Sequence, residues 1–172
     1  MVTIRAEISS DIAPREALLN RGFGPSRFRK TSEKLRNGRV AAFAFTAVDA
    51  KGKLIGTLRL WNIIAGSAGS SLLLGPLAVD SKHQKCGLGR ALMEHAISAA
   101  RAFGHDSILL VGDAPYYSRF GFSQSLTRSL HLPGPVDRAR FLGLELTEQA
   151  LDGAEGLVAA SGEMIEALQL AA

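Results

Sequence analysis

An apolar run of strand length, residues 72–79, is interrupted near its middle by Gly75-Pro76. Proline has no N–H to donate to a β-ladder, so a strand that carries it lies at a sheet edge or is bulged at that point. A bulge leaves neighbouring backbone groups unpaired, here those of Leu77 and Val79. An extended ligand that bears amides could pair with them much as an added strand does. The run therefore predicts an interrupted strand with a free backbone edge.

A glycine-containing loop and a patterned helix follow this strand. Gly87 and Gly89 open a helix over 87–103 with an apolar stripe and an opposite charged side, and Gly104 ends it. The first N–H groups of a helix lack intrahelical partners and the helix dipole is positive there, so a phosphate can bind. Three basic residues add positive charge nearby: Lys82, Lys85 and Arg90. This stretch predicts a ligand that carries phosphate.

Spacing separates the loop from two common nucleotide-binding motifs. No P-loop pattern fits the chain, and a dinucleotide fingerprint would need a third glycine where Leu92 stands. The segment Gln84-Lys-Cys-Gly-Leu-Gly89 instead follows the pattern Gln/Arg-x-x-Gly-x-Gly/Ala. It resembles the pyrophosphate loop of the GNAT superfamily of acetyl-coenzyme A-dependent N-acetyltransferases. Tyr116-Tyr-Ser-Arg-Phe-Gly-Phe122 is similar to that family's Tyr-x-x-x-Gly-Phe signature, so the motifs together span residues 72–122.

The resemblance implies a small, bacterial-type, single-domain member that uses acetyl-coenzyme A. The pantetheine amides would pair with the backbone of the interrupted strand, and the pyrophosphate would bind the loop. The cofactor-binding residues that it implies are Leu77, Ala78, Val79, Gln84, Lys85, Cys86, Gly87, Leu88, Gly89 and Arg90.

Alignment on Gly121-Phe122 puts Tyr117 at the family's general-acid position. When an amine attacks the thioester, the departing coenzyme A thiolate needs a proton, and a phenol with a pKa of about 10 is protonated at neutral pH. Some family members place a carboxylate base on the interrupted strand, but residues 72–79 contain none. The base therefore stays open, with water relayed to the backbone as an alternative. Asp113, just before Ala-Pro at a helix start, is expected to be an N-cap.

Hydrophobic periodicity predicts an α/β chain with a mixed sheet. The expected strands are 2–8, 40–48, 53–63, 72–79, 107–111, 122–132 and 141–146, and the expected helices are 14–21, 32–37 with Ser32 as its cap, 87–103, 113–121 and 161–170. Alternation in 53–63 puts Leu54, Leu58 and Leu60 on one face, with Arg59 and Trp61 on the other, where they line the acceptor cleft or merely cover the sheet. The family implies a central sheet whose two middle parallel strands splay apart, flanked by helices. We expect one N-acetyltransferase domain over 1–172, with 148–172 as a possible C-terminal extension.

Composition limits the other function classes. The 172 residues are 47% hydrophobic and 21% charged, and no apolar run has transmembrane length. The start has no basic-then-apolar layout, the single cysteine excludes an internal disulfide, and the four histidines have no metal-ligand spacing. We expect a cytoplasmic protein that needs no metal and binds no membrane. The basic cluster at 21–39 could bind nucleic acid, but it carries one aromatic and no reader motif, so a solvated face or a rim near the acidic cofactor is favoured.

These inferences predict an enzyme that moves an acetyl group from acetyl-coenzyme A to an amine on a small molecule or peptide by direct attack. The main alternative is a non-catalytic acyl-coenzyme A-binding or sensor domain, and the second is a nucleic-acid binder that uses residues 21–39. The identity of the acceptor and the choice between monomer and homodimer stay open.

Overall fold

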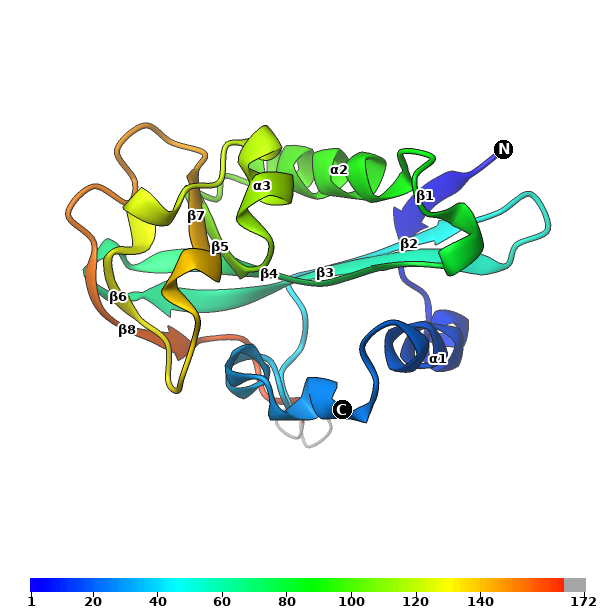
Figure 1. The fold of residues 1–172 in the computed structure, drawn as a ribbon, viewed down its shortest axis with the longest axis horizontal. Coiled ribbons are helices and arrows are strands. Elements are labelled where there is room, and N and C mark those ends of the chain that lie inside the picture. Colours follow the sequence, from blue (N-terminus) through cyan, green and yellow to red (C-terminus); the bar gives the residue numbers. More distant parts are fainter. Residues whose placement is uncertain (166–172) are drawn as a thin grey trace.

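The computed structural model describes residues 1–165, and within this range eight strands form one mixed sheet. The strands are β1 (Thr3–Ala6), β2 (Phe43–Val48), β3 (Leu54–Ala65), β4 (Ser70–Val79), β5 (Ser107–Val111), β6 (Ser129–His131), β7 (Phe141–Glu145) and β8 (Glu155–Ala160). The helices are α1 (Ile12–Phe23), α2 (Leu88–Ala102) and α3 (Ala114–Tyr117). Helices α2 and α3 lie on one side of the sheet, and α1 lies on the other (Figure 1). The predicted mixed α/β class is confirmed.

The two middle parallel strands separate soon after they pair. The main strand order is β1-β2-β3-β4-β5-β7, and β4 and β5 are parallel. Their register holds only at Leu72–Ile108 and Leu73–Leu109. Beyond these residues β4 stays paired with β3 and β5 stays paired with β7, so a V opens between them. The splayed geometry that the family implies is confirmed.

The predicted interruption of β4 is a bulge at Gly75-Pro76. Leu58 of β3 faces Leu77 and Leu60 faces Leu74, so Arg59 alone faces the two residues of the bulge. The Nε1–H of the buried Trp61 donates a 2.7 Å hydrogen bond to the Gly75 carbonyl oxygen. This bond replaces the ladder partner that the bulge removes.

A second bulge, near the start of β3, makes the predicted placement of Leu54 wrong. Val48 pairs with Leu54 and Ala47 pairs with Gly56, so Ile55 is the extra residue. Leu54 consequently packs with Leu18 and Leu19 of α1, whereas Leu58 and Leu60 face α2. The alternation of side chains fails because one inserted residue turns the rest of a strand to the other face.

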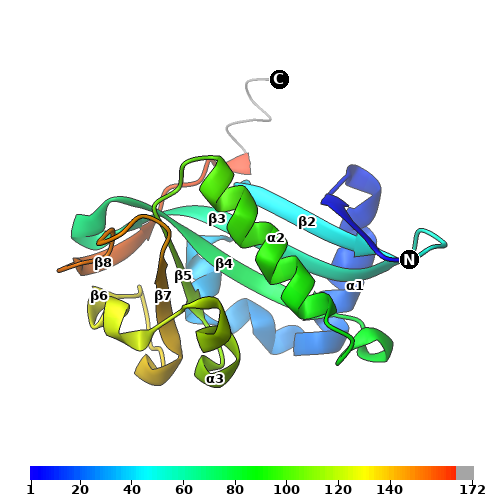
Figure 2. The same cartoon turned by 90° about the horizontal axis from the view of Figure 1, so that it is seen from above.

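The amphipathic pattern of α2 gives the core on its side of the sheet. Figure 2 shows α2 lying across the strands of the sheet, and its contacts are with β2, β3 and β4. Its fully covered residues are Leu88, Leu92, Met93, Ala96 and Ala100. Phe103, the last residue of the helix predicted over 87–103, is 75% exposed because α2 ends before it.

Three other expectations differ from the structure. The chain at 32–37 is not an α-helix capped by Ser32: two 3₁₀ segments, η2 (Pro25–Arg29) and η3 (Thr31–Leu35), occupy this region. Most of 122–132 is a 3₁₀ turn and loop before the short β6. Within 148–172, residues 155–160 form β8, which pairs with β3 and β6. The start of the helix expected at 161–170 instead packs along residues 38–40, and the rest lies outside the described residues. No helix among residues 1–165 is long and apolar enough to cross a bilayer.

Candidate active site

The V between β4 and β5 holds a cavity with a volume of about 710 Å³. Its walls include Leu74 to Leu77 of β4, Leu110 to Gly112 at the end of β5, and both tyrosines of α3. Residues from η3 and from the loop before β7 close the opposite side. Ligands of open α/β sheets bind where neighbouring strands part, because the sheet there cannot satisfy its own backbone.

The end of β4 presents a backbone edge to this V. The N–H of Asp80 donates to the carbonyl oxygen of Ile55, so Asp80 and Ala78 bond across to β3. Strand alternation then turns the N–H and C=O groups of Leu77 and Val79 away from β3, toward the side that β5 has left. The amide of Gln84 already donates to the Val79 oxygen at 3.3 Å. The side chain of Ala78 is buried against α1, so only its backbone is relevant to a ligand.

The loop from Gln84 to Gly87 leads directly into the N-terminus of α2. Lys85 and Gly87 adopt positive φ angles of 66° and 83°, and the first bond of the helix runs from the Ala91 N–H to the Gly87 oxygen. The N–H groups of Leu88, Gly89 and Arg90 therefore have no intrahelical partner. This end of α2 can hold a phosphate, as the sequence predicts.

The side chains of this loop and of the first turn of α2 differ in how available they are to a ligand. Leu88 is buried in the core, which leaves its backbone alone for a ligand. Arg90 pairs with Glu94 at 2.7 Å along the surface of α2, so its charge is partly neutralised. Cys86 is exposed and free of disulfides. The remaining residues of the predicted loop are exposed or half-buried.

Gly89 lies under a tyrosine. A Cβ atom at this position would lie 2.9 Å from the Tyr116 hydroxyl oxygen and 3.9 Å from a Val79 methyl group. The missing side chain thus keeps the first turn of α2 open toward β4 and α3. The site brings together the three motifs, which are spread over residues 72–122 of the sequence.

Tyr117 lies deeper than Tyr116. Its ring packs on Gly112, where a Cβ would come within 2.4 Å of the ring, and it contacts the Tyr116 and Phe122 rings edge-on. Burial raises the pKa of Tyr117 to about 12, and burial also raises the pKa of Tyr116. Both phenols line the cavity, so both keep their proton through the neutral range and could donate it. Asp113 is the N-cap of α3, as predicted: its Oδ2 accepts from the Tyr116 N–H.

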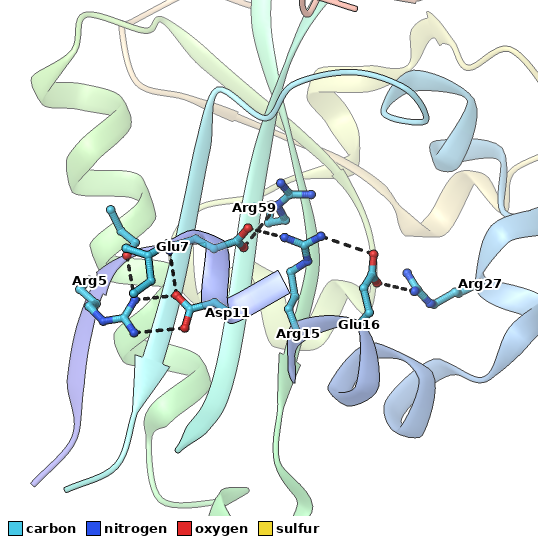
Figure 3. A network of polar contacts seen from close by, with 9 residues as sticks. Arg5, Glu7, Asp11, Arg15, Glu16, Arg27 and Arg59 are labelled. Carbon is cyan, nitrogen blue, oxygen red and sulfur yellow. Dashed lines mark hydrogen bonds and ion pairs between the residues drawn. The ribbon is translucent and has the colours of Figure 1, made fainter. Parts of the chain in front are cut away.

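A network of arginines and glutamates lies beneath the sheet; the sequence offered Arg59 as a possible wall of the acceptor cleft but did not predict the network. Figure 3 shows Glu7, Arg15, Glu16 and Arg27 linked in a row, with Arg59 beside Glu7. Arg15, Arg27 and Arg36 are at least nine-tenths buried. For residues 21–39 the sequence favoured a solvated face or a rim near the acidic cofactor, and the solvated face is wrong for Arg27 and Arg36. The excess of arginine between residues 15 and 39 was the available signal, but only the fold shows where these side chains point.

Comparisons with known proteins agree with this geometry. A family model described as an acetyltransferase (GNAT) domain matches residues 41–124. The uncharacterized N-acetyltransferase YhbS of Escherichia coli is 31% identical over 156 residues, which cover 90% of this chain and 93% of that protein. A crystal structure of the E. coli YhbS protein in complex with CoA superposes with a TM-score of 0.79 at 30% identity, covering 93% of this chain and 89% of that one.

A second solved structure supports the fold. The GNAT family acetyltransferase of Brucella melitensis, crystallised with acetyl-CoA, has a TM-score of 0.70 at 24% identity, with 94% of this chain and 96% of that chain covered.

Proposed function

Since the chain belongs to the GNAT family of acetyltransferases, we propose that it transfers an acetyl group from acetyl-coenzyme A to a primary amine. The observation that carries this proposal is the V between β4 and β5, with the free edge of β4 on one side and the N-terminus of α2 at its end. The cosubstrate is the one held by the E. coli and Brucella relatives, as CoA and acetyl-CoA respectively.

The residues around the V fit this cosubstrate. The N–H and C=O groups of Leu77 and Val79 can pair with pantetheine amides, because no strand competes for them. The first N–H groups of α2 can hold the pyrophosphate, and Gly89 leaves its approach free of a side chain. Bound there, acetyl-coenzyme A supplies an activated acetyl thioester. We also propose that residues 1–172 form a single N-acetyltransferase domain.

Tyr117 is proposed as the general acid. The acceptor nitrogen bonds to the acetyl carbon, the carbon–sulfur bond breaks, and Tyr117 gives its phenolic proton to the departing sulfur. The support is the place of Tyr117 in the cavity and its high pKa, which keeps the proton available. No carboxylate lies on β4 between residues 72 and 79, so we propose that water carries the amine proton away.

Ligand-dependent stability tests the cosubstrate. Acetyl-coenzyme A at about one hundred times its dissociation constant should add roughly 2.7 kcal/mol to the free energy of unfolding, which thermal unfolding will detect. NADH and ATP at the same concentration should add much less, because the sequence lacks their phosphate motifs. Equal shifts from all three compounds would contradict the assignment.

Release of free thiol tests the activity. Acetyl-coenzyme A plus a panel of amines should give steady release, detected with a chromogenic disulfide reagent, with a matching N-acetyl product by mass spectrometry. A protein that binds acetyl-coenzyme A but releases no thiol with any amine would favour the non-catalytic binding domain.

A further inference from the structure

A second, smaller cavity of about 210 Å³ opens on the α1 side of the sheet, and arginines form much of its wall. We call it the arginine cavity. The arginines that line it are Arg15, Arg27, Arg36, Arg39 and Arg59. Its acidic lining residues among those described are Glu16 and Glu33, and Glu7 adds a third carboxylate beside Arg15 and Arg59. Positive charge is therefore in excess around this space.

Three of the arginines are already engaged with other parts of the protein. Arg15 pairs with Glu7 and, at 3.4 Å, with Glu16. Arg27 pairs with the same Glu16 at 2.6 Å, as Figure 3 shows. Arg39 donates from Nη1 to the Gly162 carbonyl oxygen at 2.9 Å. These contacts explain their positions without any ligand.

The other two arginines keep unused donors. Arg36 donates from Nε to Glu33 at 2.8 Å, and its terminal nitrogens have no hydrogen-bond partner within residues 1–165. The carboxylate nearest Arg59 is that of Glu7, 3.7 Å away, and Arg59 donates no hydrogen bond to any described residue. Their side chains are 9% and 20% exposed. The Nε–H of Arg59 is buried without an acceptor, which is costly, so an anion placed here would be held firmly.

Arg36 connects the arginine cavity to the V. Arg36 and Pro76 line both cavities. A Cβ on Gly75 would lie 3.6 Å from Arg36 Nη1, and Arg59 faces the Gly75-Pro76 bulge in the strand register. An acceptor held by these guanidinium groups would therefore have its other end at the bulge, beside the cavity proposed for the thioester.

Positively charged groups on both sides of Arg36 also favour an anionic group at this position. Burial and the charges of Arg36 and Arg140 lower the pKa of Lys30, which lines the V. Burial and the charge of Arg15 lower the pKa of Arg59. A cationic acceptor would be repelled here, whereas an anion would relieve the mutual repulsion of these groups.

We propose that Arg36 and Arg59 bind a carboxylate carried by the acceptor, which is a small amine of the amino acid type. Guanidinium groups suit a carboxylate because their planar fork can donate two parallel hydrogen bonds. The volume of the arginine cavity fits a small molecule better than a folded protein surface. This inference rests on the proposed acetyl transfer and adds the class of its acceptor.

Matched substrates test it. Thiol release from acetyl-coenzyme A is measured with the twenty L-amino acids, with their carboxamides, and with spermidine. The carboxamide of each pair has the less basic amine and so more free amine at neutral pH, which makes chemistry alone favour it. At least one amino acid should exceed its carboxamide by about tenfold or more in kcat/KM, and spermidine should be a poor acceptor.

Variants then assign the preference to the two arginines. In Arg59→Gln and Arg36→Gln the ratio of kcat/KM for the acid to that for the amide should fall toward one, mainly through KM for the acid. Arg59→Lys, which keeps the charge but loses the planar fork, should retain part of the ratio. Arg101→Gln, an exposed arginine near the end of α2, is the control and should keep the ratio.

The outcomes separate this inference from the function on which it rests. Equal use of acids and amides, a preference for spermidine, or an unchanged ratio in Arg59→Gln and Arg36→Gln would overturn the proposal that the arginines bind the acceptor's carboxylate. Each of these results would leave acetyl transfer standing. The same holds if a protein that binds acetyl-coenzyme A turns over no amino acid. Failure to bind acetyl-coenzyme A would instead refute the proposed function.

Discussion

The two adjacent tyrosines of α3 differ in depth, which is what a division of roles would require. The Tyr117 ring is enclosed by Gly112, Phe122 and Tyr116, while Tyr116 extends toward Gly89 at the start of α2. Neighbouring helix residues point about 100° apart, so only one of the two hydroxyl groups would face the thiol of a bound cofactor. Both residues nevertheless line the cavity.

Tyr117→Phe removes the phenolic proton and keeps the ring. The Tyr117 hydroxyl has no hydrogen bond to a described residue, so the melting temperature and the affinity for acetyl-coenzyme A should change little. Turnover should fall by about a hundredfold, the usual scale for a positioned acid, and thiol-release kinetics measure it.

Tyr116→Phe is the matched control for this prediction. It should leave turnover within about threefold of the unmodified protein if Tyr117 is the acid. A slow Tyr116→Phe and a normal Tyr117→Phe would exchange the roles. If neither variant is slow, water protonates the thiolate and the pair serves packing alone.

Gly89→Val should reduce cofactor affinity far more than it reduces stability. The first atom that a side chain would meet is the Tyr116 hydroxyl oxygen, at the far end of a side chain that can rotate away. The branched side chain would, however, fill the approach to the N–H groups that open α2. Titration with coenzyme A and thermal unfolding measure the two effects. A variant that unfolds would show that Gly89 serves packing, and a folded variant that binds coenzyme A normally would contradict the role of Gly89 in the site.

At the scale of the element, one bulge connects the two halves of the site. Gly75-Pro76 turns the edge of β4 toward the V, and Trp61 of the neighbouring strand holds the bulge by its indole N–H. The same Trp61 ring lies 4.7 Å from the Arg59 guanidinium carbon, in a cation–π contact. Strand β3 thus supports both the cosubstrate edge and the arginine cavity.

Trp61→Phe should destabilise the protein by about 1–3 kcal/mol, because the buried Gly75 carbonyl loses its donor and the smaller ring leaves space. Urea unfolding followed by circular dichroism measures the change, since the variant lacks the only tryptophan. The affinity for acetyl-coenzyme A should also fall as the bulge loosens. Unchanged stability with normal binding would show that the bulge is held by the chain around it.

At the scale of the whole molecule, both faces of the sheet carry a hydrophobic core, and the α1 face carries a network of ion pairs as well. The α2 side is filled with aliphatic and aromatic side chains. On the α1 side, ion pairs join α1 to η2 and to the connection between β1 and α1. Asp11 takes part in a further ion pair. Its carboxylate accepts hydrogen bonds from both terminal nitrogens of Arg5, at 2.6 and 3.1 Å, and from the Ile8 N–H at 2.8 Å.

These carboxylates predict how the stability of the fold depends on pH. The hydrogen bonds from Arg5 hold the pKa of Asp11 below its ordinary value of 3.8, and the pKa of Asp80 is lowered mainly by the Lys82 N–H. Such a carboxylate stabilises the fold fully above its unfolded pKa, and this contribution is lost as the pH falls below about 4 toward the native pKa. Urea unfolding from pH 7 to pH 2.5 should show that loss.

Asp11→Asn isolates one contribution. The variant should be about 1–3 kcal/mol less stable at pH 7, because a charged hydrogen-bond acceptor is removed from Arg5. Its stability should also fall less steeply than that of the unmodified protein below about pH 4. Parallel curves for the two proteins would mean that other carboxylates carry the acid dependence.

The sequence by itself determined the elements whose signals are local. The apolar run broken by Gly75-Pro76, the glycines before α2 and the cap at Asp113 each fix a conformation through a few neighbouring residues, and the structure has all three. The motif order across residues 72–122 was enough to indicate the family, because the backbone geometry of a phosphate loop depends on spacing along the chain.

Only the tertiary structure decided which arginines on the α1 side of the sheet are buried and what they contact. Whether Arg36 and Arg59 are solvated or buried depends on partners more than 20 residues apart in the chain, such as Pro76 and Glu7. The one-residue bulges in β3 and β4, which set the faces of Leu54 and the register of Arg59, likewise arise from pairing between strands. Periodicity cannot reveal an inserted residue, since the face of a strand residue is fixed by its partner across the sheet.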